Sequence, residues 1–360
     1  MKDKINELRL VFWELTKRCN LRCVHCRAEA DMEQHKELST GKIKQTIDGI
    51  AAFAKPIVVL TGGEPLYRED VFDIAQYAAS KGLRAALATN GTLIDDGVAR
   101  KIKESEIARV SISIDGPDAA THDNFRGIPG SFDLALRGAH ALRGAGVEFQ
   151  FNTTVTKRNV NHFESLLGMA QSLGAKALHV FMLVPVGCGV ELAESMMLSR
   201  ERYEEILNWI YEKDVADGPL RIKATCAPHY MRVMRQKGGG APPAAHPGGH
   251  PGGGHPGGLH SMTRGCLGGT GFCFISHVGV VSPCGYLEID CGNVNEQHFK
   301  DIWEKSPQFL RLRNPDELSG KCGLCEFVRV CGGCRARAYA ATGDYMAEEP
   351  NCVYIPKPCR

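Results

Sequence analysis

The feature that most restricts the fold is a regular alternation of short apolar runs with amphipathic helical patterns over the first 215 residues. The apolar runs predict buried strands at 8–15, 57–60, 84–88, 109–114, 147–154 and 177–182. The first run precedes a helix that Ser39 or Thr40 caps and Pro56 closes, and later helical patterns cover 69–81, 95–104, 131–144, 160–173 and 200–213. Six such units predict an α/β fold, a partial (β/α)6 TIM-like barrel with functional residues at the C-terminal strand ends.

Directly after the first predicted strand, three cysteines stand within eight residues, in the segment TKRCNLRCVHCR. Cys19, Cys23 and Cys26 have CxxxCxxC spacing. A tetrahedral zinc site needs a fourth ligand, and His25 is poorly placed to share a metal with the two cysteines that flank it. Three thiolates suit a 4Fe-4S cluster with one open iron. The amino and carboxylate groups of S-adenosylmethionine (SAM) could chelate that iron. A zinc site or a disulfide loop is the alternative interpretation.

The next three predicted strands also end in candidate binding residues. The second strand runs into TGGEP, where two glycines allow close approach of the backbone and supply N–H donors, while a glutamate offers a carboxylate. The third and fourth strands end in Asn-Gly and Asp-Gly pairs, for which ordinary turn chemistry is the alternative. The candidates at these ends are Gly62, Gly63, Glu64, Pro65, Asn90, Ser113 and Asp115.

The charge balance and the N-terminus restrict the partners and the compartment. Lys and Arg number 43 against 41 Asp and Glu, a net charge of +2, which gives no electrostatic footprint for nucleic acid or for an anionic membrane surface. The N-terminus has no apolar signal region, and no run approaches the roughly 18 apolar residues of a membrane span. We therefore expect a monomeric cytoplasmic protein whose 15 cysteines are mostly metal ligands.

A low-complexity tract begins at Lys237 and contains His246, His250, His255 and His260 among glycines and prolines. It cannot build a core, so it is either a flexible loop or a mobile imidazole donor for a metal or an iron porphyrin. The tract separates three predicted regions. They are a barrel at 1–215, a linker at 216–264 and a cysteine-rich domain at 265–360.

The cysteine-rich region has a spacing too dense for structural chance, and zinc ribbons are the alternative to iron-sulfur clusters. Its candidate ligands are Cys266, Cys273, Cys284, Cys322, Cys325, Cys331, Cys334 and Cys352. The remaining cysteines are read as ordinary thiols: Cys188, Cys226, Cys291 and Cys359.

TKRCNLRCVHCR and TGGEP resemble the motifs of radical SAM enzymes, and the C-terminal cysteines resemble the SPASM extension of that group. The resemblance implies that Cys19, Cys23 and Cys26 hold the SAM-cleaving cluster, that the TGGEP segment binds the SAM amino group, and that Arg126 pairs with its carboxylate. It places Asn90, Ser113 and Asp115 near the ribose and methionine parts. It also implies two auxiliary 4Fe-4S clusters, so that with the SAM-cleaving cluster the chain would hold three. Their ligands would be Cys266, Cys273, Cys284 and Cys334 for the first, and Cys322, Cys325, Cys331 and Cys352 for the second.

CLGGTGFCFISHVGVVSPCGYLE and CGGCRARAYAATGDY resemble segments of tetrapyrrole-modifying members, and the N-terminus with the His-rich tract is most similar to the heme b synthases of the siroheme-dependent pathway. That resemblance implies oxidative decarboxylation of two propionates of iron-coproporphyrin III, with a donor such as ferredoxin or flavodoxin. His229 or a histidine of the tract would ligate the porphyrin iron, and Arg232, Arg235 or Arg264 would pair with propionates. The alternatives are a didecarboxysiroheme deacetylase, a heme d1 enzyme, a peptide maturase, or a non-enzymatic electron carrier or metal store.

Overall fold

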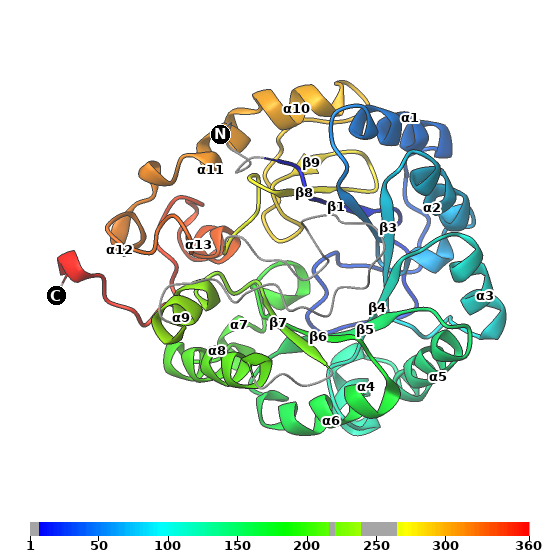
Figure 1. Cartoon of the computed structure of the whole chain (residues 1–360), viewed down its shortest axis with the longest axis horizontal. Coiled ribbons are helices and arrows are strands. Elements are labelled where there is room, and N and C mark those ends of the chain that lie inside the picture. The colour runs from blue at the N-terminus through cyan, green and yellow to red at the C-terminus, as the bar shows by residue number, and fades with distance from the viewer. Residues whose placement is uncertain (1–6, 216–219, 239–264, 360) are drawn as a thin grey trace.

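The computed structural model describes residues 7–215, 220–238 and 265–359, and its centre is one nine-stranded sheet in the order β7-β6-β5-β4-β3-β2-β1-β8-β9 (Figure 1). β9 is antiparallel to β8, and every other pair is parallel. The strands are β1 (Leu10–Glu14), β2 (Ile57–Thr61), β3 (Arg84–Thr89), β4 (Arg109–Ser113), β5 (Phe149–Val155), β6 (Ala177–Met182), β7 (Arg221–Thr225), β8 (Phe272–Ile275) and β9 (Val281–Ser282).

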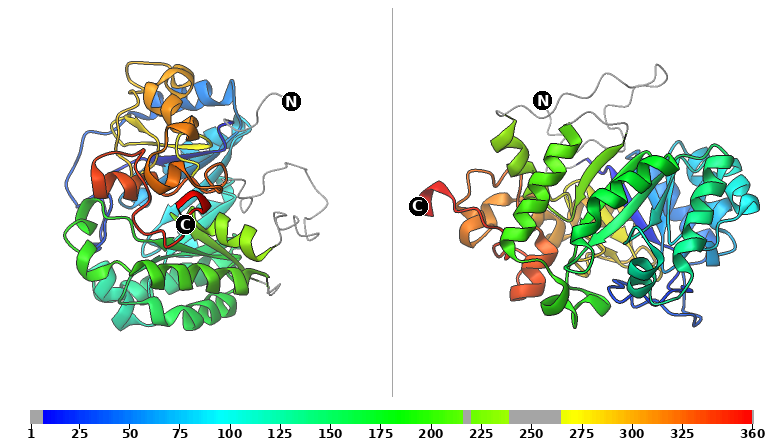
Figure 2. Two further views of the ribbon diagram at one scale, coloured as in Figure 1. Left: turned by 90° about the vertical axis from the view of Figure 1, so that its left-hand side faces the viewer. Right: turned by 90° about the horizontal axis from the view of Figure 1, so that it is seen from below.

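Helices cover the outer face of the curved sheet (Figures 1 and 2). The first helix begins where the sequence predicts, because the Ser39 hydroxyl accepts a hydrogen bond from the Lys42 N–H at 3.2 Å. The outer helices are α1 (Thr40–Ala51), α2 (Val71–Ser80), α3 (Asp96–Glu104), α5 (Ser131–Gly144), α6 (Phe163–Leu173) and α8 (Arg200–Val215). The predicted mixed α/β fold with its parallel sheet is confirmed.

The two faces of the sheet have different surroundings, since side chains alternate along a strand. Val11, Val58, Leu87, Ile112 and their counterparts on other strands pack with the helices in one large hydrophobic core. Residues at the alternate positions face the inside of the barrel. On β5 to β7 most of these inner residues keep partial exposure, whereas the outer residues are buried. The inner face is therefore the surface of the sheet that a ligand can reach.

The sheet extends beyond the six predicted units at both ends. β7 lies within the predicted linker 216–264, and β8 comes from the predicted cysteine-rich domain yet pairs with β1. One sheet therefore runs through all three predicted regions. The His-rich tract and Arg264 lie outside the described residues.

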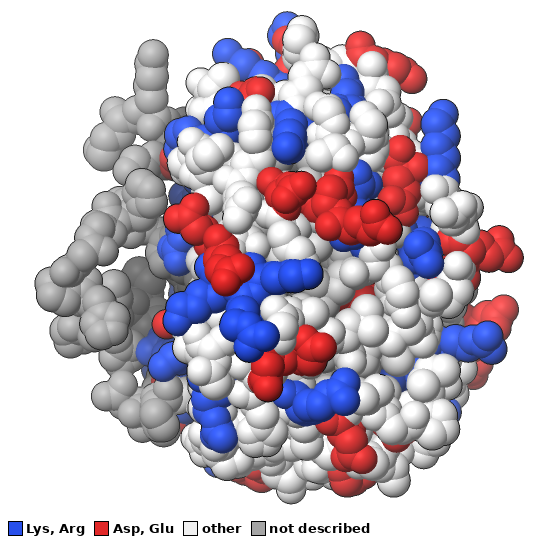
Figure 3. All heavy atoms as spheres, turned by 90° about the vertical axis from the view of Figure 1, so that its right-hand side faces the viewer, with Lys and Arg blue, Asp and Glu red and all other residues white. Residues whose placement is uncertain are grey.

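The remaining helices lie in the loops after β4, β6 and β7 and in the C-terminal region. They are α4 (Ala119–Arg126), α7 (Ala193–Met196), α9 (Tyr230–Lys237), α10 (Phe299–Lys305), α11 (Pro307–Arg313), α12 (Gly320–Gly323) and α13 (Arg335–Thr342). On the face drawn in Figure 3, basic and acidic side chains are interspersed. Among the described residues, every helix is too short or too polar to cross a membrane.

Candidate active site

The cysteine loop follows β1 and presents three thiols to one another. The pKa of Cys19 is raised to about 12, chiefly by burial and in smaller part by the nearby Glu64, Cys23 and Cys26. Donors already point at the sulfur atoms: the Leu21 N–H lies 3.4 Å from Cys19 Sγ, and Arg126 Nη1 lies 3.6 Å from Cys23 Sγ. Such donors favour thiolates over thiols, so this set fits a group that binds thiolate sulfur.

His25 does not join this set. Its ring packs against Phe125 with centroids 4.5 Å apart, as expected for a residue that is not a ligand.

The two glycines of TGGEP are required by the cysteine loop itself. A Cβ on Gly62 would lie 2.5 Å from the Thr16 carbonyl oxygen, and one on Gly63 would lie 2.5 Å from the oxygens of Lys17 and Arg18. The Gly63 N–H donates to the Thr16 carbonyl at 2.8 Å. This N–H ties the β2 loop to the cysteine loop, and the contact of the TGGEP segment with SAM stays a prediction.

Glu64 is fully buried and organises the ends of β2 and β3. Its carboxylate accepts hydrogen bonds from the Thr89 hydroxyl at 2.8 Å and from the Asn90 N–H at 2.7 Å. Burial raises its pKa to about 7, although these hydrogen bonds oppose the shift. Pro65 starts a short 3-10 turn in which the Leu66 N–H donates to the same carboxylate. Glu64 is thus a positioning group behind Asn90.

Asn90 connects this network to the cysteines. Its Nδ2 donates to Asn20 Oδ1 at 2.9 Å and lies 3.8 Å from Cys19 Sγ. Its Oδ1 accepts from the Thr92 N–H at 2.9 Å. Asn90 therefore does more than form a turn, since its side chain joins the β3 end to the cysteine loop.

Arg126 and Asp115 form a buried ion pair beside Cys23. Arg126 Nη2 lies 2.5 Å from Asp115 Oδ2, and Asp115 Oδ1 accepts from the Thr154 N–H at 2.7 Å. Burial raises the pKa of Asp115, and the neighbouring guanidinium opposes that shift. Arg126 thus contacts both Asp115 and Cys23, and its pairing with the SAM carboxylate stays a prediction. Ser113, at the end of β4, faces the inside of the barrel.

A second charged network joins β1, the cysteine loop and the segment after β8. Glu14 accepts from Arg27 Nη2 at 2.5 Å and contacts His277 Nδ1 at 2.6 Å. Burial alone would raise the pKa of Glu14, but His277 and Arg27 lower it to about 2. No local sequence pattern predicts this network, because β8 brings His277 to β1 from more than 250 residues away along the chain.

The first auxiliary group differs from the predicted one by one residue. Burial raises the pKa of Cys226, and the thiols of Cys334, Cys284 and Cys266 raise it further, so these four lie together. Cys273 instead lies on the outer face of β8, fully buried in the hydrophobic core beside Cys291. The expectations that Cys273 is a ligand and Cys226 an ordinary thiol are corrected. Recognising β7 would have placed Cys226 at a C-terminal strand end.

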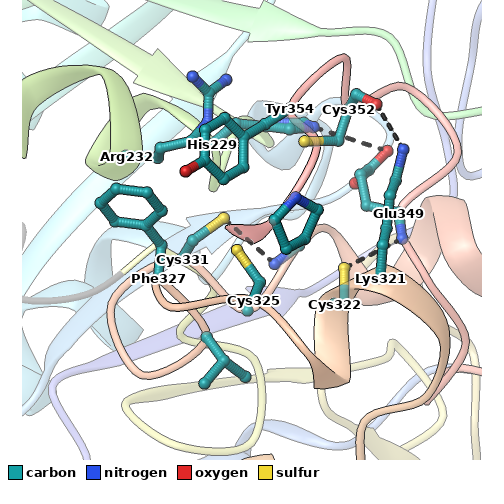
Figure 4. Close-up of a pocket in the computed structure, with 14 residues that line it drawn as sticks. His229, Arg232, Lys321, Cys322, Cys325, Phe327, Cys331, Glu349, Cys352 and Tyr354 are labelled. Atoms are coloured by element: carbon teal, nitrogen blue, oxygen red, sulfur yellow. Dashed lines mark hydrogen bonds and ion pairs between the residues drawn. The ribbon is translucent and has the colours of Figure 1, made fainter. Parts of the chain in front are cut away.

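The second auxiliary group matches the predicted one. Cys322, Cys325, Cys331 and Cys352 line one pocket, and their sulfur atoms surround a common space (Figure 4). About 390 Å³ of space beside these side chains, part of it open to solvent, is not filled by protein atoms.

His229 and Arg232 line the same pocket. His229 is 1% exposed, and burial lowers its pKa to about 3. Arg232 is buried and pairs with Glu204 at 2.5 Å. Both side chains therefore lie beside the second cysteine group, and their contacts with a porphyrin stay predictions. Arg235 lies on the exposed part of α9.

A buried ion pair joins the two auxiliary groups. Arg337 Nε lies 3.0 Å from Glu349 Oε1, and neither side chain is exposed. The Cys334 N–H donates to Glu349 at 2.6 Å, and the Glu349 N–H lies 3.3 Å from Cys322 Sγ. Arg337 also donates to the Cys226 carbonyl at 2.6 Å. The pair therefore contacts both cysteine groups.

In the described part of the chain, no group of three or more His, Cys, Asp or Glu side chains is placed to hold a single metal ion. The cysteines still gather in one set of three and two sets of four. Sets of three or four cysteine thiols are the donors that iron-sulfur clusters use. The three sets therefore fit clusters by donor chemistry.

These features define a class. The chain belongs to the radical SAM superfamily, whose model matches residues 13–170, and it carries the SPASM iron-sulfur cluster-binding domain over residues 266–334. It is an enzyme that depends on SAM, and the two domains imply 4Fe-4S clusters.

Within this class, the chain is similar to proteins named AdoMet-dependent heme synthase. The one from Nitratidesulfovibrio vulgaris is 49% identical over 100% of this chain and 97% of its own length. The one from Methanosarcina barkeri is 51% identical over 98% of each chain. The crystal structure of Streptococcus suis SuiB bound to S-adenosylmethionine covers 97% of this chain and 78% of its own, with a TM-score of 0.73 at 16% identity, and shows the shared fold alone.

Proposed function

We propose that this enzyme converts iron-coproporphyrin III to heme b by oxidative decarboxylation of two propionate side chains to vinyl groups. One observation carries the proposal: about half of all residues are shared, over the whole length, with heme synthases from two organisms. In this proposal the cysteine groups hold the iron-sulfur clusters that donate and accept the electrons of the reaction.

The three-cysteine loop is the proposed site of radical formation, with Cys19, Cys23 and Cys26 holding a cluster whose open iron binds SAM. When bound, this cluster and SAM supply a carbon radical that can remove a hydrogen atom from a propionate β-carbon. The protein holds the thiolates through Arg126 and the backbone N–H groups of the loop. Glu64 fixes Asn90 and the loop where the SAM amino group is proposed to bind.

Electron balance gives the auxiliary groups a role. Each propionate that becomes a vinyl group loses one hydrogen atom, one carbon dioxide and one electron, so an acceptor must lie near the substrate. We propose that Cys226, Cys266, Cys284 and Cys334 hold that acceptor.

The position of Tyr286 supports this assignment. Burial raises its pKa, and the thiols of Cys226, Cys284 and Cys26 act on it as well. Tyr286 therefore lies between the three-cysteine loop and the first auxiliary group. The second group, with Cys322, Cys325, Cys331 and Cys352, would pass the electron outward, and a carrier such as ferredoxin or flavodoxin would supply the electron that starts each cycle.

The test is anaerobic incubation of the reconstituted protein with SAM, a reductant and iron-coproporphyrin III, followed by mass analysis of the porphyrin. We expect stepwise loss of two carboxyl groups, with Cys26→Ala as the inactive control. Unchanged porphyrin in the presence of active SAM cleavage would contradict the proposal and favour another tetrapyrrole substrate or a peptide.

A further inference from the structure

A row of polar side chains crosses the inner face of the barrel away from the proposed SAM site. In the strand register, Ser113 of β4 stands opposite Asn152 of β5, Asn152 opposite His179 of β6, and His179 opposite Lys223 of β7. All four keep partial exposure. Gln150, one inner position before Asn152, bonds to His179 Nδ1 at 2.9 Å. The proposed cluster and SAM sites use only Ser113 of these residues.

Lys223 ends this row and has no charged partner. Its neighbours Ile222 and Ala224 belong to the outer core, so strand alternation points the lysine inward. Among the described residues, no hydrogen bond or ion pair to its ammonium is present, and burial lowers its pKa to about 8. Thr225, the next inner residue, has a buried hydroxyl that also lacks a hydrogen-bond partner there. A largely desolvated ammonium without a charged partner is stabilised when a ligand supplies the opposite charge.

The surroundings of Lys223 favour an anion. The inner positions of β4 to β7 carry Ser, Gln, Asn, Thr, Ala, His, Phe, Arg and Lys, and none of these described positions is Asp or Glu. The two arginines among them already have acidic partners: Arg109 pairs with Glu148 at 2.7 Å, and Arg221 lies 3.7 Å from Asp214. Lys223 is thus the cation on this wall whose charge is left for a ligand.

We propose that Lys223 binds a carboxylate of the substrate, namely a propionate on the periphery of the tetrapyrrole. The inference rests on the proposed function and adds a specificity residue to it. Three inter-strand steps of roughly 4.8 Å separate Ser113 from Lys223, about 14 Å in all. A large ring with carboxylates around its edge can be held by Lys223 at one side while another propionate lies toward the β4 end and the cysteine loop. Asn152 and His179 line the path between them.

The test compares wild type with Lys223→Met and Lys223→Arg in anaerobic Soret-band titrations. The probes are iron-coproporphyrin III, with four propionates, and iron-mesoporphyrin, with two. Loss of one charge-assisted hydrogen bond should weaken binding of the four-propionate probe by roughly 10- to 100-fold in Lys223→Met. The preference of wild type for that probe should shrink, and Lys223→Arg should restore part of it. Lys101→Met, which removes an exposed lysine on α3, is the matched control.

Two further readouts separate a binding role from misfolding. Iron content and SAM cleavage without porphyrin should match wild type in both Lys223 variants. Equal affinity of Lys223→Met and wild type for iron-coproporphyrin III would overturn the inference while leaving the proposed function intact. A wild-type protein that does not bind iron-coproporphyrin III would overturn both. Loss of iron or of SAM cleavage in Lys223→Arg as well as in Lys223→Met would also overturn it, because the residue would then be structural.

Discussion

The side chains of Cys226 and Cys273 point in different directions, and this difference decides which of them we propose as a ligand. Cys226 follows β7 with a φ of 55° and faces Cys266, Cys284 and Cys334, whereas Cys273 lies on the helix-facing side of β8. Spacing along the chain cannot distinguish them. The alternation in β8 can, since Phe272 and Phe274 occupy the inner positions and Cys273 an outer one.

Alanine substitution at these two positions tests the corrected ligand set. Cys226→Ala should lose roughly four iron atoms per chain, one cluster's content, together with one auxiliary signal in electron paramagnetic resonance. Cys273→Ala removes a similar thiol and should keep full iron, at a stability cost of about 1 kcal/mol. The reverse pattern of iron loss would restore Cys273 as the ligand.

The raised pKa of Glu64 predicts how the free energy of unfolding depends on pH. Its pKa is about 7 in the fold against 4.5 in the unfolded chain, so between these values the unfolded state ionises first. The free energy of unfolding should therefore fall as pH rises from 4.5 to 7, by about 3 kcal/mol relative to Glu64→Gln. Anaerobic urea unfolding at pH 5 and pH 7.5 measures this. Glu69→Gln, at an exposed neighbour, should behave as wild type, and parallel curves for wild type and Glu64→Gln would refute the assignment.

At the scale of elements, α4 anchors the cysteine loop through its C-terminal end. The Arg22 N–H donates to the Arg126 carbonyl at 3.0 Å, and the Val24 N–H to the Phe125 carbonyl at 3.1 Å. Gly127 ends the helix with a φ of 73°, and a Cβ there would lie 2.2 Å from the Arg22 carbonyl oxygen. The junction therefore depends on close backbone contact.

Alanine substitutions at two glycines distinguish the close contact at Gly127 from the effect of backbone strain alone. Gly127→Ala should displace the cysteine loop and lower SAM cleavage and iron content together. Gly130→Ala has the same left-handed strain, with a φ of 81°, but open space around its Cβ. It should cost about 1 kcal/mol in stability and keep the iron. Similar iron content in the two variants, measured after identical reconstitution, would show that the contact is not needed.

The Arg337–Glu349 pair ties α13 and the last cysteine segment to β6 and β7. Glu349→Gln leaves a fully buried guanidinium without its counter-ion, which should cost about 3–5 kcal/mol. Thermal unfolding measures the loss. Asp316→Asn breaks an exposed pair with Arg329 and should cost less than about 1 kcal/mol. Equal losses for the two variants would mean that Glu349 is not the charge partner of Arg337.

The sequence predicts the elements with strong local patterns and misses those defined by distant contacts. The helix at 131–144 is predicted to the residue, and the strand at 177–182 likewise. β7 has only two outer apolar residues, Ile222 and Ala224, so its signal is short. β8 becomes part of the sheet only by pairing with β1, and no local pattern contains that information. The same non-local pairing brings His277 to Glu14.

At the scale of the whole molecule, one sheet connects the radical site to the auxiliary cysteines. β1 leads into the three-cysteine loop, β7 into Cys226, and β8 and β9 toward Cys284. Cysteine groups therefore lie at the ends of strands from different parts of the same sheet. This arrangement suits a reaction that consumes an electron to start and releases one to finish.

The most direct test of the proposed reaction follows hydrogen from the substrate. Iron-coproporphyrin III deuterated at the propionate β-carbons is incubated anaerobically with the reconstituted enzyme, SAM and reductant. We predict deuterium in the deoxyadenosine product, with two deoxyadenosines and two carbon dioxides formed per heme. Deoxyadenosine without deuterium, formed while the porphyrin is consumed, would contradict the account.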